Sequence, residues 1–364
     1  MKNRNLLQLF FVYAVIVMVF SSCKKDDVEP EDENIEYHKL GGFYIANEGI
    51  QNGSISFYDS VKDIVVNNVF QNANSNRALG KYVQSITVVG DKAVICVNGG
   101  NNVVITEAAN MKQVAEITIP SPRYTLEIDE NTVLVSSWSD KIFVLDIEKG
   151  KILKEIAVGK SPERMIKVGD KVFVANSGNN FGAGGDKLIS IIDAKTLEVT
   201  KSLNLEYFSP VAFAKESDNY IWALCQGKTE YNSSFQIVGQ DPSCLVKIDV
   251  AACEVVKMVK LYEEKHPANI AITNDKKDII IGGGFGFVGL YKMPLSSDKI
   301  SDNPFITEAC YGFSVNPATG NIIGLVPALN GETTMIRYQP DGNEINRYQV
   351  GVYGNGAAFK KRSN

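Results

Sequence analysis

The strongest constraint on the fold of this chain is an internal repeat. Residues 164–205, RMIKVGDKVFVANSGNNFGAGGDKLISIIDAKTLEVTKSLNL, predict four short antiparallel strands, at 165–168, 171–176, 188–192 and 198–203. The first two are joined by a Gly-Asp turn, the second and third by a glycine-rich loop, and the last two by a turn at 193–196. A single unit of this kind does not bury both of its faces, so it needs copies of itself to form a core.

The copies are present, and they recur at roughly 35 to 50 residues, the spacing of the four-stranded blades of a β-propeller. Each copy repeats an apolar strand like VFVAN at 172–176, followed by further strand segments. Together with the unit above they make six, and the other five lie at 84–119, 123–158, 211–261, 269–306 and 311–350.

A seventh copy is split between the two ends of the chain. The segment FYIANEG at 43–49 matches VFVANSG at 172–178, a second strand, yet no first strand precedes Phe43. Residues 354–359, GNGAAF, have the pattern of a first strand with nothing after it. Pairing these two segments removes the open edge that an all-β chain must otherwise protect. We therefore predict an all-β fold over residues 40–364: a seven-bladed β-propeller of four-stranded antiparallel blades, closed by the C-terminal strand joining the N-terminal blade.

The first 39 residues predict an export signal and a tether. Lys2 and Arg4 precede an apolar run at 6–20 that ends in Ser21-Ser22-Cys23, which is typical of a lipoprotein signal peptide over 1–22 with lipidation at Cys23. The alternatives are ordinary secretion or a transmembrane anchor, but the run is short for a span of about 20 apolar residues. Residues 23–39 are charged and lack apolar periodicity, so we expect a flexible acidic tether.

Charge and histidine content exclude several classes of function. The chain has 37 basic and 42 acidic residues, a net charge of −5, whereas a nucleic-acid binder shows a clustered basic footprint. The two histidines, His38 and His266, stand in no metal-binding spacing and support neither a zinc site nor a nucleophilic triad. We therefore predict a non-enzymatic protein with no metal and no cofactor.

Three local patterns have simpler explanations than a cofactor site or a disulfide framework. Gly284 to Gly289 matches GxGxxG, but it lies between two strands and opens no helix, so we interpret it as a tight loop. Residues 146–151 faintly resemble a quinoprotein turn, but Leu153-Lys154 stands where those repeats carry a tryptophan. The five cysteines other than Cys23 are irregularly spaced, so we expect no disulfide framework.

One face of the predicted propeller is the candidate binding surface. The loops between blades and the loops between second and third strands open on the same face, and here they are rich in asparagine, tyrosine and arginine. Such side chains bind large polar ligands by stacking and hydrogen bonding. Turn geometry explains many single asparagines, but it does not require the aromatic and arginine members. The predicted ligand-binding residues are Arg123, Tyr124, Trp138, Arg164, Asn176, Asn269, Tyr311, Tyr353 and Asn355.

The repeat core resembles a known family. The segments GDKVFVANSGNN and SIIDAKTLEVTKSL, with the junctions Ser121-Pro122-Arg123 and Ser161-Pro162-Glu163-Arg164, resemble the YncE-like propellers of the DUF5074 type over about residues 40–360. Cys23-Lys24-Lys25-Asp26-Asp27 resembles the acidic signal that exports lipoproteins of Bacteroidota to the outer face of the outer membrane; a plain solubilising linker is the alternative. Together these features resemble surface lipoproteins encoded beside TonB-dependent transporters, among them the BtuG-like proteins that capture cobalamin (vitamin B12).

The resemblance implies a lipid-anchored protein exposed on the cell surface. It would bind a bulky nutrient, most concretely a corrinoid, and deliver it to a BtuB-like TonB-dependent transporter in the outer membrane. No binding residue is carried over from the family. Two alternatives remain open: a protein- or glycan-binding platform with the same surface chemistry, and a propeller lactonase or lyase. The scarcity of histidine disfavours the enzyme, which normally needs a metal ligand set or an acid–base pair on the central axis.

Overall fold

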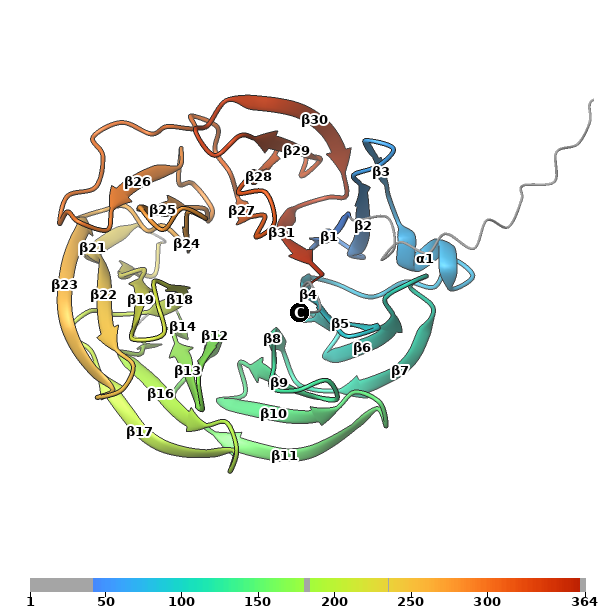
Figure 1. The fold of residues 1–364 in the computed structure, drawn as a ribbon, viewed down its shortest axis with the longest axis horizontal. Coiled ribbons are helices and arrows are strands. Elements are labelled where there is room, and N and C mark those ends of the chain that lie inside the picture. The colour runs from blue at the N-terminus through green and yellow to red at the C-terminus, as the bar shows by residue number, and fades with distance from the viewer. Residues whose placement is uncertain (1–41, 180–183, 235, 361–364) are drawn as a thin grey trace, which may run out of the picture. The chain divides into compact units, whose positions relative to one another are not determined.

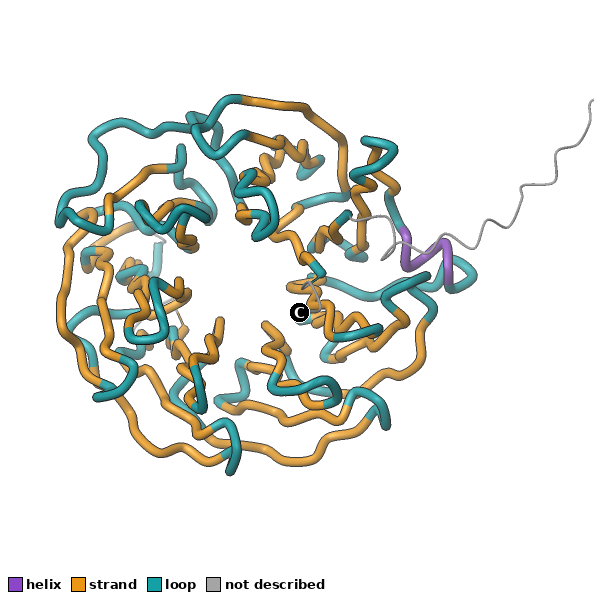
Figure 2. Tube along the Cα trace, viewed as in Figure 1, coloured by secondary structure: helices purple, strands orange, loops and turns teal. Residues whose placement is uncertain are grey.

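A computed structural model describes residues 42–179, 184–234 and 236–360. The predicted signal peptide, the lipidation site Cys23, the tether and His38 lie outside these residues. Within them, seven antiparallel sheets follow one another around a central axis and form a closed ring (Figures 1 and 2). A five-residue helix, α1 (Val69–Ala73), lies on the outside of the ring, where it connects the first two blades. The predicted seven-bladed β-propeller is confirmed.

Most blades have four strands that run outward from the axis in chain order (Figure 1). Counting from the blade that contains Phe43, this holds for blades 2, 3, 4, 5 and 7. From the inside outward, blade 2 contains β4 (Val83–Val89), β5 (Lys92–Val97), β6 (Asn102–Glu107) and β7 (Gln113–Thr118), and blade 3 contains β8 (Pro122–Glu127), β9 (Thr132–Ser137), β10 (Lys141–Asp146) and β11 (Lys151–Ala157). Blade 4 contains β12 (Pro162–Val168), β13 (Lys171–Asn176), β16 (Leu188–Asp193) and β17 (Glu198–Asn204), and blade 5 contains β18 (Pro210–Lys215), β19 (Tyr220–Cys225), β22 (Ser243–Asp249) and β23 (Glu254–Tyr262). Blade 7 contains β27 (Gly312–Val315), β28 (Ile322–Pro327), β29 (Thr333–Tyr338) and β30 (Glu344–Val350).

Blade 6 is a shorter version of the same unit. It contains β24 (Asn269–Ile272), β25 (Asp278–Gly282) and β26 (Tyr291–Pro294), and residues 301–306 take the outer position by bonding the backbone of Leu290 and Lys292. The loop between β25 and β26 contains the GxGxxG sequence. Gly284, Gly286 and Gly289 all have positive φ, so this is a tight loop that favours glycine, as expected.

Two small hairpins decorate the loops between second and third strands. In blade 4 the hairpin pairs β14 (Gly178–Asn179) with β15 (Gly184–Gly185), and in blade 5 it pairs β20 (Lys228–Tyr231) with β21 (Ile237–Asp241).

Blade 1 closes the ring in the predicted way. Its order is β3 (Ile64–Val66), β2 (Ser54–Asp59), β1 (Phe43–Asn47) and β31 (Gly354–Phe359), so the C-terminal strand is the innermost strand of the N-terminal blade. The pairing runs from Phe43 opposite Phe359 to Asn47 opposite Gly354. On the outer side, Asp63 accepts hydrogen bonds from Tyr58 of blade 1 and from Arg337, Asn346 and Tyr348 of blade 7. The seam is therefore held at both its inner and its outer edge.

The apolar core lies between the blades. In the second strand β13 five of six residues are buried, whereas six of the seven residues of the outer strand β17 are exposed. A middle strand has a neighbouring blade on each face, which explains the continuous apolar runs that mark the repeat. The five cysteines of the described residues, Cys96, Cys225, Cys244, Cys253 and Cys310, are free thiols buried in this core.

The innermost strands share an irregularity that shapes the centre of the ring. In five blades the register with the second strand shifts by one residue near the same end of the innermost strand. Such a β-bulge re-aims the extra side chain. It also interrupts the alternation of apolar and polar residues. This is why the sequence predicted that the inner strand of blade 4 starts at Met165, whereas β12 starts at Pro162.

Candidate functional site

An open cavity of about 710 Å³ lies at one end of the ring, on the axis. Its walls come from the connections between blades, from the first residues of the innermost strands, and from the loops after the second strands. The connections between blades and the loops after the second strands are the two sets expected to share one face. Seven of the nine predicted ligand-binding residues line it: Arg123, Tyr124, Trp138, Arg164, Asn269, Tyr311 and Asn355.

The bulges place equivalent residues of the repeat at the cavity wall. In the five blades with a bulge, the second residue of the innermost strand lines the cavity, and we call this the bulge position. Its residues are Gln84, Arg123, Glu163, Val211 and Asn355. The backbone position is repeated while the side chain differs from blade to blade. The chemistry of the cavity is therefore set by single residues on a common scaffold.

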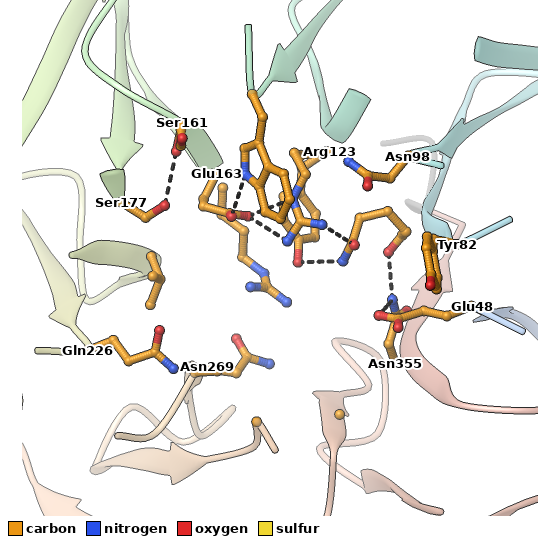
Figure 3. Close-up of a pocket in the computed structure, with 18 of the residues that line it drawn as sticks. Glu48, Tyr82, Asn98, Arg123, Ser161, Glu163, Ser177, Gln226, Asn269 and Asn355 are labelled. Atoms are coloured by element: carbon orange, nitrogen blue, oxygen red, sulfur yellow. Dashed lines mark hydrogen bonds and ion pairs between the residues drawn. The ribbon is translucent and has the colours of Figure 1, made fainter. Parts of the chain in front are cut away.

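A buried ion pair joins blades 3 and 4 at this level. The Arg123 guanidinium lies 3.1 Å from the Glu163 carboxylate, and their side chains are only 13% and 8% exposed. The indole Nε1 of Trp138 donates to the other Glu163 oxygen at 2.9 Å, and the Trp138 ring stacks on Arg123 at 4.1 Å (Figure 3). Burial is the largest influence on the pKa of Arg123 and acts to lower it. The charge of Glu163 and its hydrogen bond to Arg123, together with Tyr124 and Glu48, outweigh burial, so the pKa lies above its ordinary value. Arg123 is a fixed cation whose charge is already matched.

Hydrogen bonds extend this pair toward blades 1 and 2. The Gln84 side chain accepts from Arg123 and donates to the Tyr124 hydroxyl at 3.0 Å. Asn355 donates to the Gln84 backbone oxygen at 2.8 Å and to Glu48 at 2.9 Å (Figure 3). The side chains on this part of the wall are therefore held in place before any ligand arrives, which lowers the entropic cost of binding.

Tyr311 completes the same network from blade 7. Its hydroxyl donates to the Glu48 carboxylate at 3.0 Å. Burial, and after it the charge of Glu48, raises the pKa of Tyr311 well above its ordinary value. Tyr311 is thus a neutral donor at any physiological pH.

The opposite wall, formed by blades 5 and 6, carries no charge. At the bulge position of blade 5 stands Val211, and the amides of Gln226 and Asn269 lie beside each other (Figure 3). Asn269 donates to the Phe313 backbone oxygen at 2.9 Å, and Gln226 donates to the His266 backbone oxygen at 3.2 Å. His266 itself is engaged with Gln226 and Gln240 rather than with the cavity.

Two predicted residues do not line the cavity. Asn176 is the last residue of β13 and is fully buried, where it donates to the Leu188 backbone oxygen at 3.0 Å and to Ser190 at 3.1 Å. Asn47 makes the same kind of bond to Ser56 in blade 1, so this asparagine is a structural feature of the repeat. Loop position alone did not distinguish a strand-end amide that turns inward from one that faces the cavity.

Tyr353 was also predicted as a cavity residue and lies behind the wall instead. Its ring packs edge-on against Tyr311 at 6.3 Å. It therefore supports a cavity residue rather than facing a ligand.

The most important residue that the prediction missed is Glu163. The signal was present: Ser161-Pro162-Glu163 repeats Ser121-Pro122-Arg123, which places opposite charges at equivalent positions of neighbouring blades.

Within the described ranges, no group of three or more His, Cys, Asp or Glu side chains is placed to hold a metal ion. In the same ranges, no helix is long and apolar enough to cross a membrane.

Comparison with known families agrees with the architecture. A family described as a domain of unknown function, DUF5074, matches residues 41–326, which is most of the chain. The chain belongs to the DUF5074 family. No curated protein matches this DUF5074 chain.

Many solved propellers share the fold of this DUF5074 protein. Hydrazine synthase of Kuenenia stuttgartiensis superposes with a TM-score of 0.60 at 19% identity, over 74% of this chain and 86% of that one. The Cps50 (Swd1) β-propeller domain of Myceliophteria thermophila gives 0.59 at 11% identity, over 86% and 95%. The Pan2 WD40 domain of Neurospora crassa gives 0.54 at 13% identity, over 79% and 87%. At these identities the likeness concerns the fold alone.

Proposed function

We propose that this DUF5074 propeller is a non-enzymatic binding protein that captures a bulky, amide-rich nutrient in the central cavity. The ligand we propose is a corrinoid such as cobalamin. The observation that carries the proposal is the lining of the cavity: aromatic planes, guanidinium groups and amides on one pre-organised wall, in a volume of about 710 Å³. That volume lies in the upper part of the range for small-molecule sites, which favours a large ligand over a small one.

The chemistry of a corrinoid matches this lining. A corrinoid has a flat apolar ring edged by amide side chains that both donate and accept hydrogen bonds. The Trp138 ring is 45% exposed and is held from behind by Arg123, so it offers a rigid plane for stacking. The amides of Gln226 and Asn269 stand across the cavity as partners for the ring's own amides.

We further propose that the ligand is passed to a TonB-dependent outer-membrane transporter of the BtuB type. The face around the cavity supports a protein partner, because the loops after the second strands expose apolar side chains there. These are Ile50, Ile237, Val238, Phe285, Val288 and Leu329. Exposed apolar surface is a feature of protein–protein contact sites.

The location we propose rests on the N-terminal sequence. A signal peptide ending before Cys23, followed by the acidic tether, supports a lipid-anchored protein on the outer face of the outer membrane. The resemblance to YncE-like and BtuG-like surface lipoproteins supports the same assignment.

Isothermal titration calorimetry tests the ligand. Residues 24–364, which include every described blade, should bind cyanocobalamin at one per monomer and release it unchanged. Trp138→Ala should weaken binding by about 1–3 kcal/mol, as expected for a central aromatic anchor. The control is Lys195→Ala: this exposed lysine pairs with Asp170 in turns at the other end of blade 4, and its loss should leave binding unaltered.

A negative result would be clear. If calorimetry shows no heat and dialysis retains no colour at tens of micromolar protein, the corrinoid proposal is wrong. A glycan panel and a pull-down against outer-membrane proteins would then test the protein- or glycan-binding alternative, which the same aromatic residues suit.

A further inference from the structure

Four charged side chains line the cavity, and three of them are already engaged. Glu163 is paired with Arg123 and Trp138, and Glu48 accepts hydrogen bonds from Tyr311 and Asn355. The fourth is Arg164, the residue that follows Glu163 on β12. Arg123 and Glu163 form an ion pair with each other, and the Glu48 carboxylate is bonded by two neutral donors.

Arg164 differs from every other arginine in the described ranges. Each of the others, Arg77, Arg123, Arg337 and Arg347, forms an ion pair with a carboxylate. The Arg164 side chain forms no ion pair and no hydrogen bond with any described residue, and its one contact of note is the Tyr124 ring, whose centroid is 4.3 Å from the guanidinium carbon. The side chain is half-buried in the cavity wall. A cation that has lost part of its water without gaining an acceptor is costly, so this group favours a ligand that supplies one.

The surroundings of Arg164 are pre-organised. Tyr124 lies against one face of the guanidinium, and its hydroxyl is held by Gln84, which in turn is bound by Arg123. Stacking on one face leaves the N–H groups at the edge of the guanidinium free. The neighbouring Glu163 does not compete for them, because its two oxygens already accept from Arg123 and Trp138.

We infer that Arg164 is an oxyanion subsite of the cavity and binds a phosphate or carboxylate group of the ligand. The planar guanidinium presents paired N–H donors that match such a group in a two-bond arrangement. The inference rests on the proposed function in so far as the cavity must bind a ligand. If that ligand is cobalamin, the group is the single phosphodiester that links the nucleotide to the corrin ring.

The test compares two corrinoids that differ in this group. Calorimetry is run on wild-type protein, Arg164→Gln and Arg347→Gln with cyanocobalamin and with dicyanocobinamide, which lacks the phosphodiester and the nucleotide. Arg164→Gln should weaken cyanocobalamin binding on the order of ten- to a hundredfold, the usual range for a hydrogen bond to a charged group, and should leave dicyanocobinamide within about twofold. Arg347 lies on the outer strand β30, so the matched control Arg347→Gln should change neither affinity.

Each outcome bears on the inference. No loss with Arg164→Gln, or an equal loss for both corrinoids, would overturn it while leaving the proposed function intact. If wild-type protein binds neither corrinoid, the proposed function fails, and inorganic phosphate then decides about Arg164. Phosphate raises unfolding temperatures in general relative to chloride of equal ionic strength, so the two proteins are compared. The increase should be larger in the wild type than in Arg164→Gln. A shift that does not depend on Arg164 would overturn the inference. Should Arg164→Gln fail to fold, Arg164→Lys replaces it, since lysine keeps the charge but loses the paired donors.

Discussion

The two walls of the cavity are built on the same repeat and differ in chemistry. At the bulge position, blades 3 and 4 carry Arg123 and Glu163, whereas blade 5 carries Val211. The first wall is charged, aromatic and tied together by hydrogen bonds, and the second is neutral. The register shift is the same in each of these blades. In this fold the repeated backbone determines the direction of the side chain at the bulge position. The residue type at that position determines whether the side chain contributes a charge or an apolar surface to the cavity.

The largest loss of stability should come from deleting β31, the strand that closes the ring. Deleting residues 354–364 removes β31, leaves the edge of β1 unpaired and takes Asn355 out of the charged wall. We expect aggregation or loss of cooperative unfolding in chemical denaturation. A truncated protein that unfolds like the full chain would contradict closure by this strand.

The next effect separates the two walls in stability. Arg123→Ala leaves the buried Glu163 carboxylate without its counter-ion, which should lower the free energy of unfolding by roughly 3–5 kcal/mol. Val211→Ala at the equivalent position of blade 5 removes only apolar atoms and should cost about 1–2 kcal/mol. Urea unfolding of both variants measures the difference. Equal losses would mean that the charged wall is no more tightly coupled than the neutral one.

The walls should also differ in their share of ligand binding. Tyr124→Ala removes the plane under Arg164 and should weaken cyanocobalamin binding by about 1–3 kcal/mol. Asn269→Ala on the neutral wall should cost less than about 1 kcal/mol, because its amide already bonds the Phe313 backbone. Tyr124→Phe serves as a control that keeps the ring and loses only the bond to Gln84. A larger loss with Asn269→Ala would reverse the comparison.

The smallest effect is a pH dependence confined to the charged wall. The folded-state pKa of Tyr311 is raised by burial and by Glu48, so the unfolded chain releases this proton first, near the ordinary tyrosine pKa of about 10. The stabilisation is complete below that pH and is lost as the pH rises above it. Unfolding free energies measured from pH 8 to 11 should therefore fall less steeply in Tyr311→Phe, by at most about 1.4 kcal/mol per pH unit. Parallel curves would show that Tyr311 is not held in its neutral form by the fold.

The architecture could be predicted from the repeat alone. Strands such as VFVAN and FYIAN recur at blade spacing, and an apolar run between turns is buried between blades wherever it occurs. The split of blade 1 could be predicted because the N-terminal copy lacks a first strand and the C-terminal segment 354–359 is a first strand without a blade of its own. Pairing the two segments closes the ring. Most of the predicted binding residues line one cavity, because in a propeller all loops between blades and all loops after second strands open on the same face.

Which side chains on that face line the cavity, and which are buried behind it, depends on contacts between blades. Arg123 and Glu163 are 40 positions apart, and they come into contact because neighbouring blades stand side by side. The repeat places them at equivalent positions of two blades, and the distance between these positions follows from the packing of the blades. The bulges change the direction of the side chains at the cavity wall, so alternation predicted neither the start of β12 nor the role of Glu163. Asn176 and Asn269 are both asparagines at strand ends. One is sealed inside a blade and the other faces the cavity, because burial depends on what the rest of the chain places beside each residue.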